Sequence, residues 1–154
     1  NADFLAGRMN FTDGAGAGSV LNQGSINAAG GPVYMVGNAV TNQGIITSPG
    51  GEVILAAGNS VELVNPGTPN LRVEIQAASN EARNLGSVVA EAGRIGIYAG
   101  LIKQGGTLNA DSAVAEGGRI MLKSTKRTDL EAGSVTSAKG TTGGQIIALS
   151  DMNN

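Results

Sequence analysis

The chain contains no cysteine and no histidine among its 154 residues. Without cysteine there is no disulfide framework and no thiolate chemistry. The absence of histidine also excludes Ser-His-Asp triads, Cys-His dyads and the common zinc sites. An enzyme built from this sequence would have to use paired carboxylates, as glycosidases do. We therefore expect no catalytic, metal-binding or cofactor-binding residues, and no cofactor.

Aromatic residues, proline and net charge are also scarce. The chain has two tyrosines, two phenylalanines, four prolines and a net charge of −2. With so few aromatic side chains, the core must consist of small and medium aliphatic residues, which suits a thin solenoid. A slightly acidic chain does not attract a phosphate backbone, so we expect no nucleic-acid partner. No apolar run approaches the roughly 18 residues of a membrane span.

Glycine is abundant, with 25 residues, and it marks an internal repeat. A Gly-Gly or Ala-Gly pair followed by alternating apolar residues occurs at 30–36, 50–56, 92–98, 117–123 and 143–149. One apolar column reads Val33, Val53, Ile95, Ile120 and Ile146, and the next reads Met35, Leu55, Ile97, Leu122 and Ala148. Alternation with a period of two predicts strands with one face inward. Self-similarity at about 20 residues predicts a repeat architecture.

Two further strands recur with the same period. The inward column of the second strand reads Ile26, Ile46, Val88, Leu108 and Val135, and the small residues two positions later are Ala28, Ser48, Ala90, Ala110 and Ser137. A weaker third strand lies at 19–22, 39–42, 60–63, 101–103 and 129–131. Residues 3–11 match the start of the repeat, which predicts that Met9 and Phe11 point inward. Each coil is therefore expected to hold three short strands.

These repeats predict an all-β fold, a right-handed parallel β-helix or β-solenoid of about six coils of roughly 20–26 residues. The spacing breaks once, between Gly51 and Gly93, where two alternating runs flank a turn at 65–70. We predict a β-hairpin insert near 61–84 that leaves the solenoid wall, with one degenerate coil as the alternative. Residues 1–154 are expected to form a single β-helix domain or a segment of a longer β-helix.

One outward column carries charge. It reads Pro32, Glu52, Arg94, Arg119 and Gln145. If the insert loops out, Glu52 and Arg94 become neighbours on adjacent strands, and we expect an exposed ion pair worth at most about 1 kcal/mol. Tyr34 and Tyr98 are predicted to face outward, where they could stack on sugars.

The remaining polar motifs are interpreted as turns and loops. Glu91 and Glu116 both precede a glycine-led strand, and we interpret them as solvated turn residues. Lys123, Lys126 and Arg127 are predicted to form a small basic loop, for which contact with an anionic glycan is the alternative to simple solvation. The glycines at 14, 16 and 18 are expected to form a tight corner.

Residues 1–7, 16–26 and 50–59 carry a resemblance to a known family. The runs Asp-Phe-Leu-Ala-Gly and Asn-Gln-Gly-x-Ile in these segments are similar to the filamentous haemagglutinin family. More narrowly, they resemble the later part of the secretion domain of two-partner-secretion exoproteins. The resemblance implies a right-handed β-helix that a partner β-barrel transporter exports across a Gram-negative outer membrane. It also implies a secreted or cell-surface location, and a shaft that serves adhesion, biofilm formation or toxin delivery.

Three functions follow as hypotheses. The first is a non-catalytic adhesin segment with a transporter partner and host or cell-surface glycans as ligands. The second is a filament subunit whose open solenoid ends associate end to end. The third is a carbohydrate-active β-helix enzyme, which the sequence disfavours because no carboxylate cluster emerges from the aligned repeats. Because Asn1 does not begin a signal peptide, we expect a removed signal or a slice of a longer exoprotein.

Overall fold

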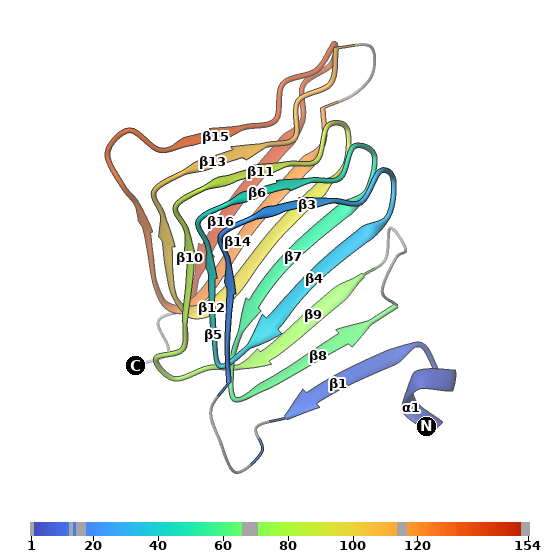
Figure 1. The fold of residues 1–154 in the computed structure, drawn as a ribbon, viewed down its shortest axis with the longest axis vertical. Coiled ribbons are helices and arrows are strands. Elements are labelled where there is room, and N and C mark those ends of the chain that lie inside the picture. The colour runs from blue at the N-terminus through green and yellow to red at the C-terminus, as the bar shows by residue number, and fades with distance from the viewer. Residues whose placement is uncertain (1, 13, 15–17, 66–70, 114–116, 152–154) are drawn as a thin grey trace.

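The structure is a computed structural model of the chain that describes residues 2–12, 14, 18–65, 71–113 and 117–151. The described part is all-β apart from the short helix α1 (Ala2–Leu5). Parallel strands form two sheets, and a third sheet is antiparallel. This arrangement is consistent with the predicted β-solenoid and shows how the glycine-rich sequence stacks on itself (Figure 1).

The strands that follow the Gly-Gly and Ala-Gly pairs form the first wall. They are β4 (Pro32–Gly37), β7 (Glu52–Ala57), the start of β12 (Arg94–Gln104), the start of β14 (Arg119–Leu130) and β16 (Gln145–Ser150). Each pairs in parallel with the next, and the register matches both predicted inward columns. The inward columns of this wall are confirmed.

Two more walls complete each turn. The second wall contains β2 (Ser19–Asn22), β5 (Ala39–Asn42), β10 (Glu81–Asn84) and the later halves of β12 and β14. The third wall contains β3 (Ser25–Asn27), β6 (Ile45–Thr47), β11 (Ser87–Val89), β13 (Thr107–Asn109) and β15 (Val135–Ser137). Every coil thus contributes one strand to each wall.

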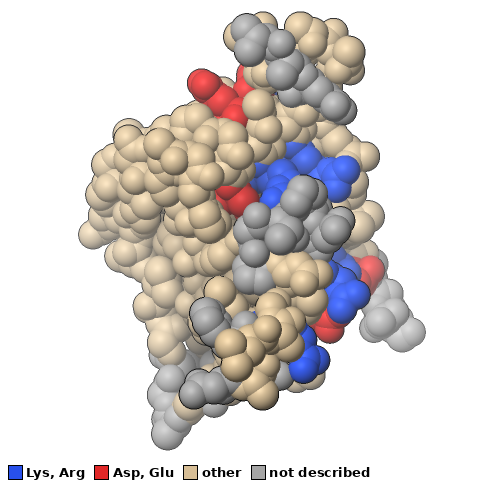
Figure 2. Space-filling view, turned by 90° about the vertical axis from the view of Figure 1, so that its right-hand side faces the viewer, with Lys and Arg blue, Asp and Glu red and all other residues tan. Residues whose placement is uncertain are grey.

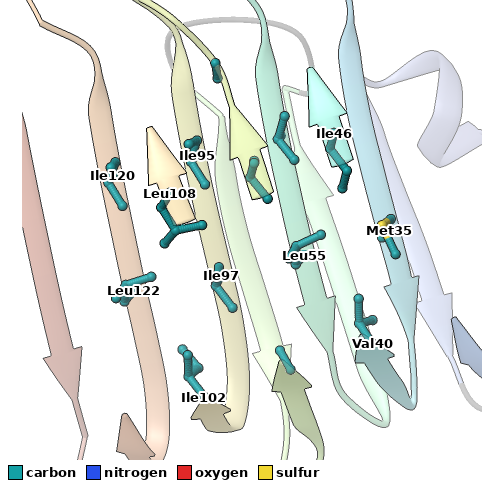
Figure 3. Close-up of a cluster of buried hydrophobic side chains, with 14 of the residues drawn as sticks. Met35, Val40, Ile46, Leu55, Ile95, Ile97, Ile102, Leu108, Ile120 and Leu122 are labelled. Carbon is teal, nitrogen blue, oxygen red and sulfur yellow. The ribbon is translucent and has the colours of Figure 1, made fainter. Parts of the chain in front are cut away.

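The core lies between the three walls. Leu55, Ile97, Ile46 and Leu108 are fully buried and Ile95 nearly so, and all belong to one cluster. Figure 3 shows these side chains from successive rungs pointing into the same interior. One coil is too thin to bury its own inner face. The aliphatic side chains of each coil therefore also pack against those of the neighbouring coils along the stack.

The predicted first turn of the repeat is wrong. β1 (Arg8–Thr12) pairs antiparallel with β8 (Ser60–Val64) and lies outside the parallel walls. Met9 packs against a second apolar cluster outside the solenoid core, and Phe11 is exposed. The described parallel walls therefore hold five rungs rather than six. Alternation alone could not distinguish the two pairings, since parallel and antiparallel strands share the same period.

The hairpin insert is confirmed, but its predicted limits are too wide. β8 pairs antiparallel with β9 (Arg72–Gln76), whereas most of the predicted turn lies outside the described residues. β10 does not belong to the insert, because it pairs in parallel with β5 and β12. β10, and not 60–63, is therefore the third strand of that coil. The apolar residues of the insert pack against an outer face of the first wall.

The last coil shifts the predicted register by one residue. Leu108 faces Thr136 rather than Val135, and Val135 is 50% exposed. Ala138 instead of Ser137 joins Ala90 and Ala110 in the core. The cause is the corner: two residues separate Gln104 from Thr107, but four separate Leu130 from Val135.

Glycine is sterically required at the corner between the second and third walls. A Cβ on Gly44, Gly86 or Gly106 would lie 2.0–2.1 Å from the carbonyl oxygen of the glycine one coil below. Non-bonded carbon and oxygen atoms do not approach so closely, so Gly44, Gly86 and Gly106 cannot carry a side chain at this strand spacing. The last coil differs, because its register places Ser134 opposite Gly106. The corner glycines therefore allow the second, third and fourth coils to stack closely.

A ladder of side-chain amides follows the same corner inside the core. Asn22 donates to Asn42 at 2.8 Å, Asn42 donates to Asn84 at 2.9 Å, and Asn84 donates to Gln104 at 2.9 Å. Asn42, Asn84 and Gln104 are fully buried. Their amide groups also donate to corner carbonyls, such as Asn84 to Thr107 at 3.1 Å. Buried amides are tolerated because each is hydrogen-bonded.

Candidate functional site

A shallow polar groove of about 750 Å³ runs along the stack where the third wall turns into the first. Its floor is the backbone of the Gly-Gly and Ala-Gly corners, and its polar side chains include Glu52, Arg94, Arg119 and Gln145. The predicted outward column is thus confirmed, because these residues are register partners in β7, β12, β14 and β16. Figure 2 looks onto this side of the molecule and shows basic side chains gathered there.

Glu52 and Arg94 are neighbours as predicted, but they are not an exposed pair. Arg94 Nη2 lies 2.8 Å from Glu52 Oε2, and the Glu52 side chain is only 4% exposed. Tyr34 also donates its hydroxyl to Glu52 Oε1 at 2.8 Å. Removing one partner of a buried pair costs about 3–5 kcal/mol, because it leaves a buried charge uncompensated. The pair therefore fixes the Arg94 guanidinium at the groove.

Arg119 sits beside this pair on the next strand. It is the register partner of Arg94, and it is exposed. Among the described residues, no acidic side chain lies within ion-pair distance of Arg119. Two guanidinium groups therefore stand on adjacent rungs of the groove, and the described carboxylate of Glu52 pairs with only the first. This arrangement suits the binding of an anion, because guanidinium groups bind carboxylates and sulfates through several hydrogen bonds.

The two tyrosines do not form an open sugar-stacking surface, contrary to the prediction. Both pack against a second apolar cluster built from Ile54, Ala56, Val61, Leu63 and Val73. This cluster joins the outer face of the first wall to the hairpin β8–β9. Burial, with the negative charge of Glu52 adding to it, raises the pKa of Tyr98 to about 12. The hairpin therefore covers the outer face that would otherwise display the aromatic rings.

Gly96 makes room for this packing. A Cβ at Gly96 would lie 2.5 Å from a ring carbon of Tyr98 and 2.8 Å from Cδ1 of Ile54. The ring of Tyr98 thus lies over a residue of its own strand that has no side chain. On this outward face, Tyr34, Ile54, Gly96, Met121 and Ile147 are register partners on successive strands.

The predicted basic loop is wrong. Lys123, Lys126 and Arg127 lie within β14, a continuous strand that bends from the first wall into the second. Lys123 lies 3.9 Å from Asp151, Arg127 lies 2.6 Å from Asp129, and Lys126 donates to Ser79 Oγ at 3.1 Å. The loop prediction failed because these Ser, Thr and Lys residues form a strand by pairing with β12 of the neighbouring coil. The apolar residues of that stretch come from β12 and not from the polar run itself.

The other predicted turn residues add no site. Glu91 is exposed at its corner, and Glu116 lies outside the described residues, as does most of the glycine bend at 14–18. Within the described residues, no three acidic, histidine or cysteine side chains gather as a metal site would require. No described helix has the length and apolarity that crossing a membrane takes.

Sequence reasoning missed the buried amide ladder. The signal was present, because Asn22, Asn42, Asn84 and Gln104 each stand two residues before a corner glycine. The runs Asn-Gln-Gly at 22–24 and 42–44 also read as turn signals, which hides their part in the ladder. An amide that recurs in one column of a repeat is also able to bond to its copy one coil away, which is what the structure shows.

Comparison with known proteins is informative for solved structures. No protein-family model matches the chain, and no curated protein matches it. Among solved structures, the crystal structure of the HMW1 secretion domain from Haemophilus influenzae superposes with a TM-score of 0.83 and 31% sequence identity over 98% of the chain. The chain is similar to a bacterial secretion domain. It spans 42% of the length of that domain.

Proposed function

We propose that the chain is a non-catalytic segment of a secreted, haemagglutinin-like exoprotein of a Gram-negative bacterium. The observation that carries this proposal is the similarity to the HMW1 secretion domain over 98% of the chain. The resemblance of residues 1–7, 16–26 and 50–59 to two-partner-secretion exoproteins supports it independently of the structure. In this proposal an outer-membrane transporter exports the exoprotein, the coils close into a right-handed β-helix, and the exported protein serves adhesion at the cell surface.

The experiment that tests export uses the bacterium that encodes the chain. The gene for its two-partner-secretion transporter is deleted, and an antibody against this segment follows the exoprotein in the medium and on intact cells. We expect the protein to disappear from both fractions and to return when the transporter gene is restored. An unchanged amount outside the cell in the deletion strain would refute export by this route. An unrelated secreted protein serves as the control for membrane integrity.

A second candidate function is end-to-end self-association into filaments. Ile146 belongs to an inward column, yet it is 48% exposed because it lies on the last described rung of the first wall. At the opposite end of the stack, the inward residue Val20 of β2 is only partly buried, whereas its register partner Val40 one rung further in is fully buried. Uncovered rungs are able to pair with another strand edge. Sedimentation velocity of the wild-type chain and of Ile146→Lys tests this candidate function. Filament formation predicts concentration-dependent assemblies in the wild-type chain that Ile146→Lys loses. The control variant Leu85→Lys, on the side of the stack, should retain them.

A further inference from the structure

Arg94 and Arg119 occupy directly facing positions on two parallel strands of the first wall. Neighbouring strands lie about 4.8 Å apart, and like charges placed opposite each other on a sheet destabilise it. Glu52 compensates Arg94 from the far side, at 2.8 Å. Arg119 brings a second positive charge onto the next rung. The facing pair therefore carries one more positive charge than Glu52 neutralises, and an anion bound in the groove would compensate it.

We propose that this groove binds an acidic saccharide, and that Arg119 and Arg94 hold a carboxylate or sulfate group of the sugar. The guanidinium of Arg94 is held by the buried carboxylate of Glu52, which itself accepts a hydrogen bond from Tyr34. The Arg94 guanidinium is therefore already oriented before an anion binds, so binding costs little conformational entropy of the Arg94 side chain. Arg119 lies one rung further along the groove and completes a two-guanidinium clamp.

The lining of the groove favours a sugar over a peptide. Apart from Pro32 and Ala92, its lining residues are glycine, charged or polar. An extended peptide needs pockets for its alternate side chains, and this lining offers no apolar pocket. A saccharide instead needs donors and acceptors spread along an open surface. Gln145 and Thr142 supply side-chain amide and hydroxyl groups beside the arginines, and ring hydroxyls can bond to both.

The test measures binding of short acidic saccharides to the purified 154-residue chain by isothermal titration calorimetry. One probe is an oligogalacturonate, which carries a carboxylate on each ring, and the other is a sulfated galactan oligomer of similar length. The methyl ester of the oligogalacturonate is the uncharged control. We expect one or both charged probes to bind and the ester to bind much more weakly. The stronger charged probe identifies whether the groove takes a carboxylate or a sulfate. Failure of both charged probes to bind overturns the proposal.

Arg119→Gln is the decisive variant, because the residue is exposed and its removal leaves no described ion pair broken. The loss of a charge-assisted contact predicts that Kd rises about tenfold or more. Arg72→Gln removes the same charge from the hairpin, where Arg72 is 68% exposed, and should leave Kd unchanged. Equal losses in the two variants would show a non-specific charge effect and overturn the site. Far-UV circular dichroism and melting curves check that both variants fold.

Two further probes exclude other ligands. A short poly-glutamate peptide that binds as tightly as the saccharide, and that loses affinity equally in Arg119→Gln, would overturn the saccharide class. Inorganic sulfate that binds as tightly as the sulfated oligomer would reduce the groove to a simple anion site and also contradict the proposal. These measurements use purified protein and involve no export. Their outcome is therefore distinguishable from failure of the proposed export function.

Discussion

The side-chain amide of Asn42 donates to Oδ1 of Asn84 across 2.9 Å, although 42 residues separate the two in the chain. The hairpin β8–β9 lengthens that separation beyond the 20 residues between Asn22 and Asn42, since it leaves the stack and the chain returns one rung later. The amide ladder therefore continues across the insertion as if the insert were absent. The stack is the organising unit, and the hairpin is an addition to it.

Asn84→Ala is predicted to destabilise the protein by about 2–4 kcal/mol. The change removes bonds to Asn42, Gln104 and the Thr107 carbonyl, and it leaves buried polar groups without partners. Urea unfolding measures the free energy. The matched control is Gln23→Ala, which breaks the exposed amide pair with Gln43 and should cost well under about 1 kcal/mol. Equal costs would show that the buried ladder adds nothing beyond a surface contact.

Ile95→Asp is predicted to abolish folding. Ile95 is 1% exposed, and a carboxylate there would be an unpaired charge inside the stack. Met121 lies in the outward column and is partly exposed, so Met121→Asp should lower the melting temperature only modestly. Thermal melts followed by circular dichroism compare the two variants. Similar melting temperatures would contradict the facing of the first wall.

Gly106→Ala is predicted to cost about 1–3 kcal/mol, because the new Cβ would meet the carbonyl oxygen of Gly86 at 2.0 Å and the backbone would have to shift. Gly14→Ala is the control, since a Cβ at Gly14 meets no atom within 4 Å. The free energy of unfolding in urea distinguishes them. If both substitutions were neutral, the corner glycines would not be needed for close stacking of the coils.

Tyr98 is predicted to ionise near pH 12 in the folded protein, because burial and Glu52 raise its pKa. In Tyr34→Phe it is the only tyrosine, so ultraviolet absorbance of the phenolate reports it alone. The unfolded chain should titrate near pH 10. Since the folded pKa is the higher one, this contribution to stability is complete below pH 10 and is lost as the pH rises to about 12.

Leu63→Ala tests whether the hairpin causes the raised pKa of Tyr98. Leu63 is fully buried between the hairpin and the first wall, in the cluster that also contains Tyr98. Loosening the hairpin should hydrate the phenol and move its ionisation down toward pH 10. Glu62→Ala, one position along β8, should leave the titration unchanged. A phenol that ionises near pH 10 in the unmodified protein would show that the hairpin does not cover it.

Much of the fold could be predicted because each repeat has apolar residues at the same positions after its glycine corner. Val33, Val53, Ile95 and Ile120 align in sequence and in register, since a two-residue period and a glycine corner leave one way to stack them. The prediction failed where local pattern does not specify the partner. Met9 and Phe11 alternate as a wall strand would, yet β1 pairs with the hairpin. Val135 lost its inward place because a longer corner shifted the register by one residue.

The sequence by itself determined the all-β class, the inward columns and the absence of histidine and cysteine chemistry, because composition and periodicity act locally. Only the tertiary structure decided which polar residues matter. Glu52 reads as a surface residue, but its side chain is only 4% exposed, pairs with Arg94 and accepts a hydrogen bond from Tyr34. Burial depends on what a distant segment covers, and the groove depends on which rungs become neighbours. Glu52 and Arg94 stand 42 residues apart in the chain, and stacking places them 2.8 Å apart.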